Sequence, residues 1–171
     1  MRGVYYCAGG LVVSLAVVTV VVATYSREVR PLGARFRASM PGNPTEHHRT
    51  QGDLGATSYD LRHWGCAYSV IYSDSVPGGL AASEVSSAAK EVAKGWGGAV
   101  VTERELPRGG WPEVGEEFEA VGPGHLRVKG RLAVFRGRIY IWYVGCSPSV
   151  WVFPWTQHYA RQFVTAFEAL Q

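Results

Sequence analysis

Residues 117–145, EFEAVGPGHLRVKGRLAVFRGRIYIWYVG, contain successive segments in which apolar and polar side chains alternate. Alternation with period two and an abundance of β-branched and aromatic residues are typical of strands. The segments that show this pattern are 116–121, 125–135 and 138–145. Arg136 and Gly137, between the last two segments, predict a tight hairpin. The stretch therefore predicts neighbouring antiparallel strands.

The rest of the chain extends this sheet and adds two helices. Short segments bounded by Gly or Pro predict further strands at 36–40, 45–51, 55–62, 64–73 and 99–106. After Pro77-Gly78-Gly79, apolar residues recur at helical spacing as far as Trp96, which predicts an amphipathic helix. An aromatic stripe predicts a C-terminal helix that contains Trp155, Tyr159, Phe163, Phe167 and Leu170. This order predicts an α+β fold in which helices flank an antiparallel β-sheet.

Residues 4–24, VYYCAGGLVVSLAVVTVVVAT, form an uncharged stretch that is apolar on every face. A helix of this length spans roughly 30 Å, about the thickness of the hydrocarbon core of a bilayer. The length favours a retained transmembrane anchor, because the apolar core of a secretory signal has only about 7–15 residues. Val21-Val22-Ala23 resembles a cleavage box, so a cleaved signal stays open as the alternative. The chain thus divides into an anchor or signal at 1–24, a linker at 25–34 and one domain at 35–171.

The predicted domain carries almost no net charge. The chain has 17 basic and 14 acidic residues, and Arg2, Arg27 and Arg30 precede the domain. A nearly neutral domain lacks the electrostatic signature of nucleic-acid binding, so we do not expect nucleic acid as a partner. Cys66 and Cys146 are too few for a disulfide scaffold and lack the spacing of a zinc site. Whether they pair depends on their geometry.

Four segments together resemble an uncharacterised family of bacterial exported or membrane-anchored proteins: FRASMPGNP, YSVIYSD, the stretch at 117–145 and ARQFVTAF. The resemblance spans about residues 36–167. It implies a PsbP-like α/β/α sandwich, a scaffold used for docking onto other macromolecules, and it implies no catalytic residue. Arg136-Gly137-Arg138 and Ala166 depart from the family pattern, but conservatively for a turn and a helix face. The resemblance implies that the core contains Phe36, Tyr68, Tyr140, Phe163 and Phe167.

The expected location follows from this resemblance rather than from charge. Arg27, Arg30, Arg35 and Arg37 crowd the C-terminal side of the apolar segment, and the positive-inside rule alone would place the domain in the cytoplasm. That rule misleads when basic residues lead into a domain, and the family points outward. We therefore expect a single-pass membrane protein with its domain outside the cytoplasm. A secreted or periplasmic domain is expected if the segment is cleaved.

No motif predicts a catalytic or cofactor site. His47, His48, His63 and His125 could ligate a metal together with Glu46 or Asp60, but adjacent histidines on a strand point to opposite faces. Ser69, Ser73 and the two domain cysteines lack the sequence context of a nucleophile. None of the 21 glycines forms a phosphate-binding motif. We expect no enzyme, cofactor or metal; the alternative is a hydrolase or metal-dependent enzyme whose site no motif reveals.

Two features could form a partner-binding surface. Arg127, Lys129 and Arg131 share one strand face, and Arg138 extends the row if the turn folds back. The row suits an anionic partner such as lipid head groups. The alternative, which we favour, is a solvated face neutralised by Glu116, Glu117 and Glu119.

Aromatic residues around CSPSVWVFPW form the second feature: Trp142, Trp151, Phe153 and Trp155. If exposed, they mark a recognition site; the density of apolar residues favours burial instead. The sequence thus predicts a membrane-tethered or exported, non-catalytic binding or scaffold domain, whose partners are the membrane and an unknown protein or anionic surface. The candidate contact residues are Arg127, Lys129, Arg131, Arg138, Trp142, Trp151 and Trp155.

Overall fold

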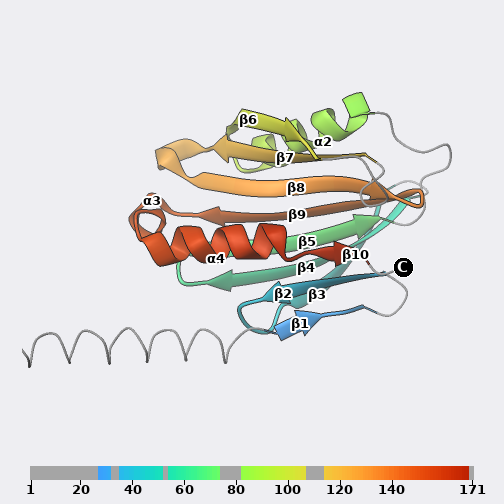
Figure 1. Cartoon of the computed structure of the whole chain (residues 1–171), viewed down its shortest axis with the longest axis horizontal. Coiled ribbons are helices and arrows are strands. Elements are labelled where there is room, and N and C mark those ends of the chain that lie inside the picture. Colours follow the sequence, from blue (N-terminus) through green and yellow to red (C-terminus); the bar gives the residue numbers. More distant parts are fainter. Residues whose placement is uncertain (1–26, 32–34, 52–53, 74–81, 107–113, 170–171) are drawn as a thin grey trace, which may run out of the picture.

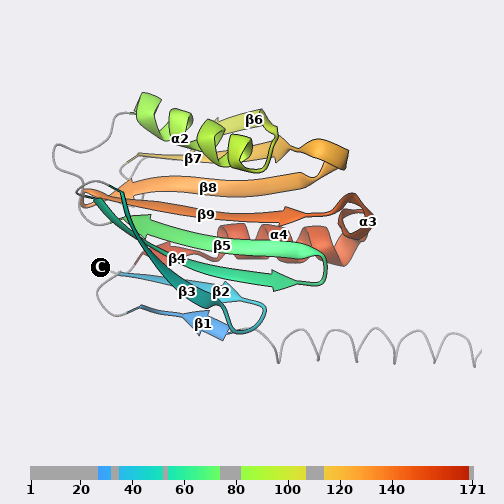
Figure 2. The ribbon, with the colours of Figure 1, turned by 180° about the vertical axis from the view of Figure 1, so that it is seen from behind.

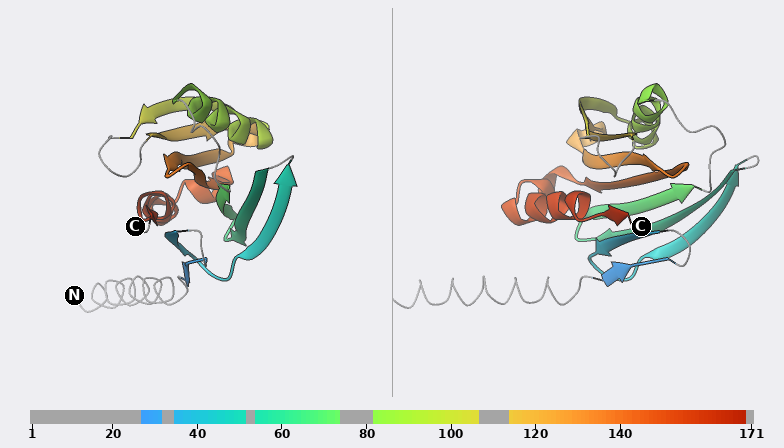
Figure 3. Two further views of the ribbon diagram at one scale, coloured as in Figure 1. Left: turned by 90° about the vertical axis from the view of Figure 1, so that its right-hand side faces the viewer. Right: turned by 45° about the vertical axis from the view of Figure 1, so that its right-hand side comes forward.

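The main element of the fold is a seven-stranded sheet in the order β3-β4-β5-β9-β8-β7-β6, in which every neighbouring pair is antiparallel. The computed structural model describes residues 27–31, 35–51, 54–73, 82–106 and 114–169 (Figure 1). The strands are β3 (Thr45–Gln51), β4 (Leu54–His63), β5 (Cys66–Ser73), β6 (Ala99–Glu105), β7 (Val114–Val121), β8 (Arg127–Phe135) and β9 (Arg138–Cys146). The antiparallel sheet predicted from alternation is thus confirmed. The sheet twists strongly from edge to edge (Figure 3).

A second, three-stranded sheet, in the order β1-β2-β10, brings together the N-terminal and C-terminal segments of the domain. Its strands are β1 (Arg27–Val29), β2 (Phe36–Met40) and β10 (Glu168–Ala169). The linker predicted at 25–34 is therefore wrong in part. Residues 27–29 pair with β2, and Val29 is buried in the core. One apolar residue in a polar segment is too weak a pattern to reveal such a strand.

Two longer helices cover opposite faces of the large sheet, α2 (Ala82–Gly95) and α4 (Pro154–Thr165) (Figures 1 and 2). The short helices η1 (Pro123–His125) and α3 (Pro148–Trp151) connect elements at one end. Helix α2 packs on β6, β7 and β8, and α4 packs on β8, β9 and β2. Alternate residues of β9 point to opposite faces of the sheet. Tyr140 and Trp142 belong to the core beneath α4, whereas Ile141 and Tyr143 pack against the core beneath α2.

The C-terminal helix ends earlier than the aromatic stripe predicted. Helix α4 stops at Thr165, and the chain then forms β10 against β2. Phe167 stacks on Trp142 and on Phe36, with ring centroids 4.0 Å and 5.1 Å apart. The position of Phe167 is therefore determined by its contacts with two strands that are distant in sequence, and not by the periodicity of a helix.

The residues that the resemblance placed in the core are all buried, which confirms that expectation. Aromatic contacts link them across strands and helix; the Phe163 and Tyr68 rings, for example, meet edge to face at 5.2 Å. The five are Phe36, Tyr68, Tyr140, Phe163 and Phe167.

A disulfide joins Cys66 to Cys146, which lie directly opposite each other on β5 and β9. It crosses the one pair of adjacent strands in the large sheet that are distant in sequence.

The predicted anchor or signal at 1–24 lies outside the described residues. Among the residues that are described, no helix is long and apolar enough to cross a membrane.

Candidate functional site

The basic row on β8 is largely neutralised by carboxylates of β7. Lys129 Nζ lies 2.8 Å from Glu119 Oε1 and 3.2 Å from Glu117 Oε1. Arg131 Nη2 lies 2.6 Å from Glu117 Oε2. Cross-strand register produces these pairs, because Glu117 lies opposite Arg131 and Glu119 opposite Lys129.

These ion pairs shift the pKa values of their members. Burial alone would raise the pKa of Glu117, but Arg131 and Lys129 lower it below its usual value. Burial would lower the pKa of Lys129, but hydrogen bonds to Glu119 and Glu117 raise it. Both groups are held in their charged forms. The middle of the row therefore offers little free positive charge to a partner.

Glu116 is not part of this cluster, contrary to our expectation. It lies on the opposite face of β7, where its side chain is buried and its Oε1 has no hydrogen-bond partner among the described residues. Burial, followed by repulsion from Glu103, raises the pKa of Glu116. Strand alternation makes this outcome inevitable, since consecutive residues cannot share a face.

Arg138 does not extend the basic row. It pairs with Phe135 at the hairpin end of β8 and β9, whereas Arg127 pairs with Cys146 at the other end. Two apolar positions of the same face, Ala133 and Phe135, separate Arg131 from the hairpin. The turn folds back as predicted, but the register leaves Arg138 at the far end of the strands.

The aromatic residues of the predicted surface divide between core and solvent. Trp142 is buried, and its Nε1 donates a hydrogen bond to the carbonyl oxygen of Val164 at 2.8 Å. Trp151 is partly buried against the same core. Phe153 and Trp155 are exposed, with their rings stacked 4.6 Å apart. The expectation that this cluster is mostly buried is therefore wrong for Phe153 and Trp155.

Trp64, which the sequence did not single out, lies at the same end of the domain. It occupies the β4–β5 turn and is 57% exposed. The neighbouring Gly65 accepts a hydrogen bond from Ser147 N at 3.1 Å, and a Cβ on Gly65 would lie 2.6 Å from Val150 Cγ2. The turn thus packs directly on α3. We call the exposed side chains at this end the apolar end: Trp64, Val152, Phe153 and Trp155.

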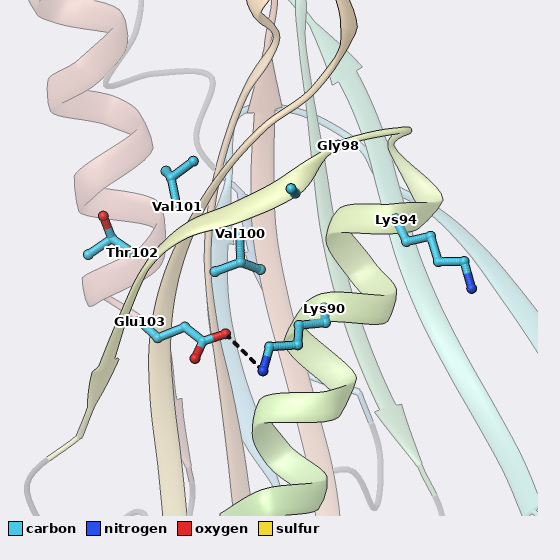
Figure 4. Close-up of a pocket in the computed structure, with 8 residues that line it drawn as sticks. Lys90, Lys94, Gly98, Val100, Val101, Thr102 and Glu103 are labelled. Atoms are coloured by element: carbon cyan, nitrogen blue, oxygen red, sulfur yellow. Dashed lines mark ion pairs between the residues drawn. The ribbon is translucent and has the colours of Figure 1, made fainter.

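Two surface grooves are also present. One lies between α2 and the edge strand β6, where Lys90 Nζ is 3.8 Å from Glu103 (Figure 4). The other adjoins the apolar end and is lined by Arg62, Trp64 and Trp96 among others. The second lining contains His63 and Ser147, but the Ser147 hydroxyl lies 3.1 Å from the hydroxyl of Ser149 and the His63 ring stacks on Trp64 at 4.5 Å. Cys66, which also lines it, is in the disulfide.

The fold is similar to that of a known cyanobacterial protein. The solution structure of cyanobacterial PsbP (CyanoP) from Synechocystis sp. PCC 6803 matches with a TM-score of 0.62 at 10% sequence identity, covering 85% of this chain and 92% of the other. A protein of unknown function from Pseudomonas aeruginosa, PA94, described as a putative regulator, matches with a TM-score of 0.40 at 13% identity, covering 80% and 94%. Comparison with known protein families and with curated proteins finds no match. The PsbP-like α+β fold is thus confirmed, and at this identity the likeness concerns the fold alone.

The residues considered for catalysis have other partners in this fold. His48 lies 3.0 Å from Thr57 Oγ1 and 3.1 Å from Glu46. Ser69 Oγ donates to Asp60 Oδ1 at 2.6 Å, and the Ser73 hydroxyl accepts from the amide of Ile139. Within the described ranges, no group of three His, Cys, Asp or Glu side chains is arranged to hold a metal ion.

Proposed function

We propose that this chain is a membrane-tethered, non-catalytic binding domain whose contact surface is the apolar end. One observation carries the proposal. Of the large hydrophobic side chains that are exposed in the described residues, only Val101 lies elsewhere. Single exposed hydrophobic residues are ordinary on a soluble domain, whereas a gathered set marks an interaction site.

Local sequence choices at the apolar end support a binding role. Trp64 and Gly65 form a two-residue hairpin loop with φ angles of 47° and 71°. Asn or Gly is favoured at the first position, and a bulky side chain there is unusual. Phe153 is the N-cap residue of α4, where Ser, Thr, Asp or Asn would satisfy a backbone amide. Neither aromatic residue is explained by local stability.

The tether and the location rest on two further features. The uncharged segment at 4–24 is long enough to span a bilayer. The Cys66–Cys146 disulfide supports a domain outside the cytoplasm, because disulfides persist in oxidising compartments. The resemblance described above, whose family is exported or membrane-anchored, agrees with both. No specific observation favours the hydrolase or metal-dependent alternative.

Site-specific photo-crosslinking in cells that naturally contain the protein tests this proposal. A photoreactive amino acid replaces Trp155 or Trp64 in turn, and Val101 serves as the control because it is exposed to the same extent as Trp64, 57%. We expect adducts, to protein or to lipid, from positions 155 and 64 but not from 101. Equal labelling at all three positions, or none at 155 and 64, would overturn the proposal.

A further inference from the structure

We infer that the surface bound by the apolar end is the lipid bilayer itself. In this arrangement Trp64, Phe153 and Trp155 lie at the level of the lipid head groups. The exposed arginines Arg27, Arg62 and Arg127, which we call the basic rim, face anionic head groups. The inference rests on the proposed function, because it names the partner of the same surface.

The position at which the chain enters the domain carries this inference. Arg27, the first residue of β1, pairs with Met40 of β2. Two residues later Gly42 packs against Leu61, since a Cβ on Gly42 would lie 3.6 Å from Leu61 Cδ2. Leu61 precedes Trp64 by three residues on β4. The chain therefore enters the domain beside the β4–β5 turn, at the same end as α3 (Figure 1).

The length of the connection keeps this end close to the membrane. The apolar segment ends at Thr24, three residues before Arg27. Even a fully extended chain covers only about 3.6 Å per residue, so roughly 10 Å separates the end of the segment from β1. A segment that spans the bilayer therefore holds Arg27, and with it the end of the domain at which the chain enters, within roughly 10 Å of the membrane surface.

The chemistry of this end matches a bilayer interface. A Trp ring is suited to the head-group region because it combines an apolar body with a polar N–H group. Phe contributes an apolar ring at the boundary between head groups and acyl chains. Arg127 begins β8 beside α3 and, unlike Lys129 and Arg131, has no carboxylate partner among the described residues. Arg62, next to the turn, has none among them either. Glu28 beside Arg27 reduces the positive charge only locally.

Spin labels on the full chain, reconstituted into vesicles of phosphatidylcholine and phosphatidylglycerol, test the inference. Cys7→Ala first removes the cysteine that is not in the disulfide. One spin label at a time is then attached to a cysteine introduced by Trp64→Cys, by Trp155→Cys or, as the control, by Val101→Cys. Oxygen concentrates in lipid, whereas a nickel chelate stays in water. We expect oxygen to relax the labels at 64 and 155 several-fold more than the chelate does, and the reverse order at 101.

A second measurement keeps the native side chains and guards against misfolding of the cysteine variants. Brominated lipids should quench the tryptophan fluorescence of the parent, and Trp64→Phe with Trp155→Phe should remove most of that quenching. Val101→Ser, the matched control, should leave it unchanged.

The two proposals fail in different ways. If the labels at 64 and 155 are accessible mainly to the chelate and bromine quenching is insensitive to the tryptophan variants, the lipid inference is wrong. Protein adducts from the same positions in cells would then preserve the proposed function with a protein partner. Absence of both lipid contact and adducts would overturn both proposals.

Discussion

Glu116 is a buried carboxyl group with a raised pKa, and it makes the stability of the domain depend on pH. Because its folded pKa lies above its unfolded pKa, Glu116 favours folding at pH values below the unfolded pKa. This contribution is lost as the pH rises through the folded pKa. We expect Glu116→Gln to be as stable as the parent at about pH 4 and more stable than the parent at pH 7. Denaturant unfolding at both pH values measures this, and a variant no more stable at pH 7 would contradict it.

The basic residues of β8 should respond differently to charge reversal according to their partners. Lys129→Glu brings a third carboxylate to Glu117 and Glu119, and we expect the free energy of unfolding to fall by more than about 1 kcal/mol. Arg127→Glu, on the same strand face but without such partners, should change it by less than about 0.5 kcal/mol. Chemical denaturation of both variants checks the contrast. Equal losses would mean that the β7–β8 ion pairs do not stabilise the domain.

At the scale of elements, Phe163 is one of the buried side chains through which α4 packs on the sheet. Its ring meets Tyr68 edge to face and is 5% exposed. We expect Phe163→Ala to lower the free energy of unfolding by about 3–5 kcal/mol, because it leaves a cavity between helix and sheet. The exposed neighbour Gln162 supplies the control, Gln162→Ala. If the two variants melted at the same temperature, the packing of α4 described above would be wrong.

The disulfide joins β5 and β9, whose cysteines are 80 residues apart in sequence. Closing so long a loop restricts the unfolded chain, so replacing both cysteines with serine should lower the free energy of unfolding by roughly 2–4 kcal/mol. The fold should persist, because β5 and β9 still pair along their length. Thermal unfolding with far-ultraviolet circular dichroism measures both effects. A loss below about 0.5 kcal/mol would show that the disulfide contributes little to stability.

At the scale of the whole molecule, the membrane topology of the chain is open to a direct test. We fuse the C-terminus to a reporter enzyme that works only outside the cytoplasm, and we expect this reporter to be active. If residues 4–24 are retained, the activity should be found in the membrane fraction. The expectation rests on the length of that segment and on the disulfide, against the adverse positive-inside count. Activity confined to a cytoplasmic reporter would refute it.

Alternation along the chain was enough to predict most of the sheet, because period-two patterning depends on neighbouring residues alone. The turn at Arg136-Gly137 and the sharing of one face by Lys129 and Arg131 follow from the same local rule. Strand pairing across 27–29 and the early end of α4 escaped prediction. Residues 27–29 contain a single apolar side chain, so their own pattern is too weak to reveal a strand. Helix α4 ends early because β10 pairs with β2, which lies at the other end of the domain sequence.

The residues of the proposed binding surface could likewise be predicted only in part from the sequence. Composition near α3 identified Trp142, Trp151 and Trp155 as candidates but could not tell which are exposed, because burial depends on what packs against each ring. Trp64 joins them only because the β4–β5 turn packs on α3 through Gly65. Local physical chemistry therefore set the strands, turns and charge pairing, whereas contacts between distant segments set which aromatic side chains face solvent together.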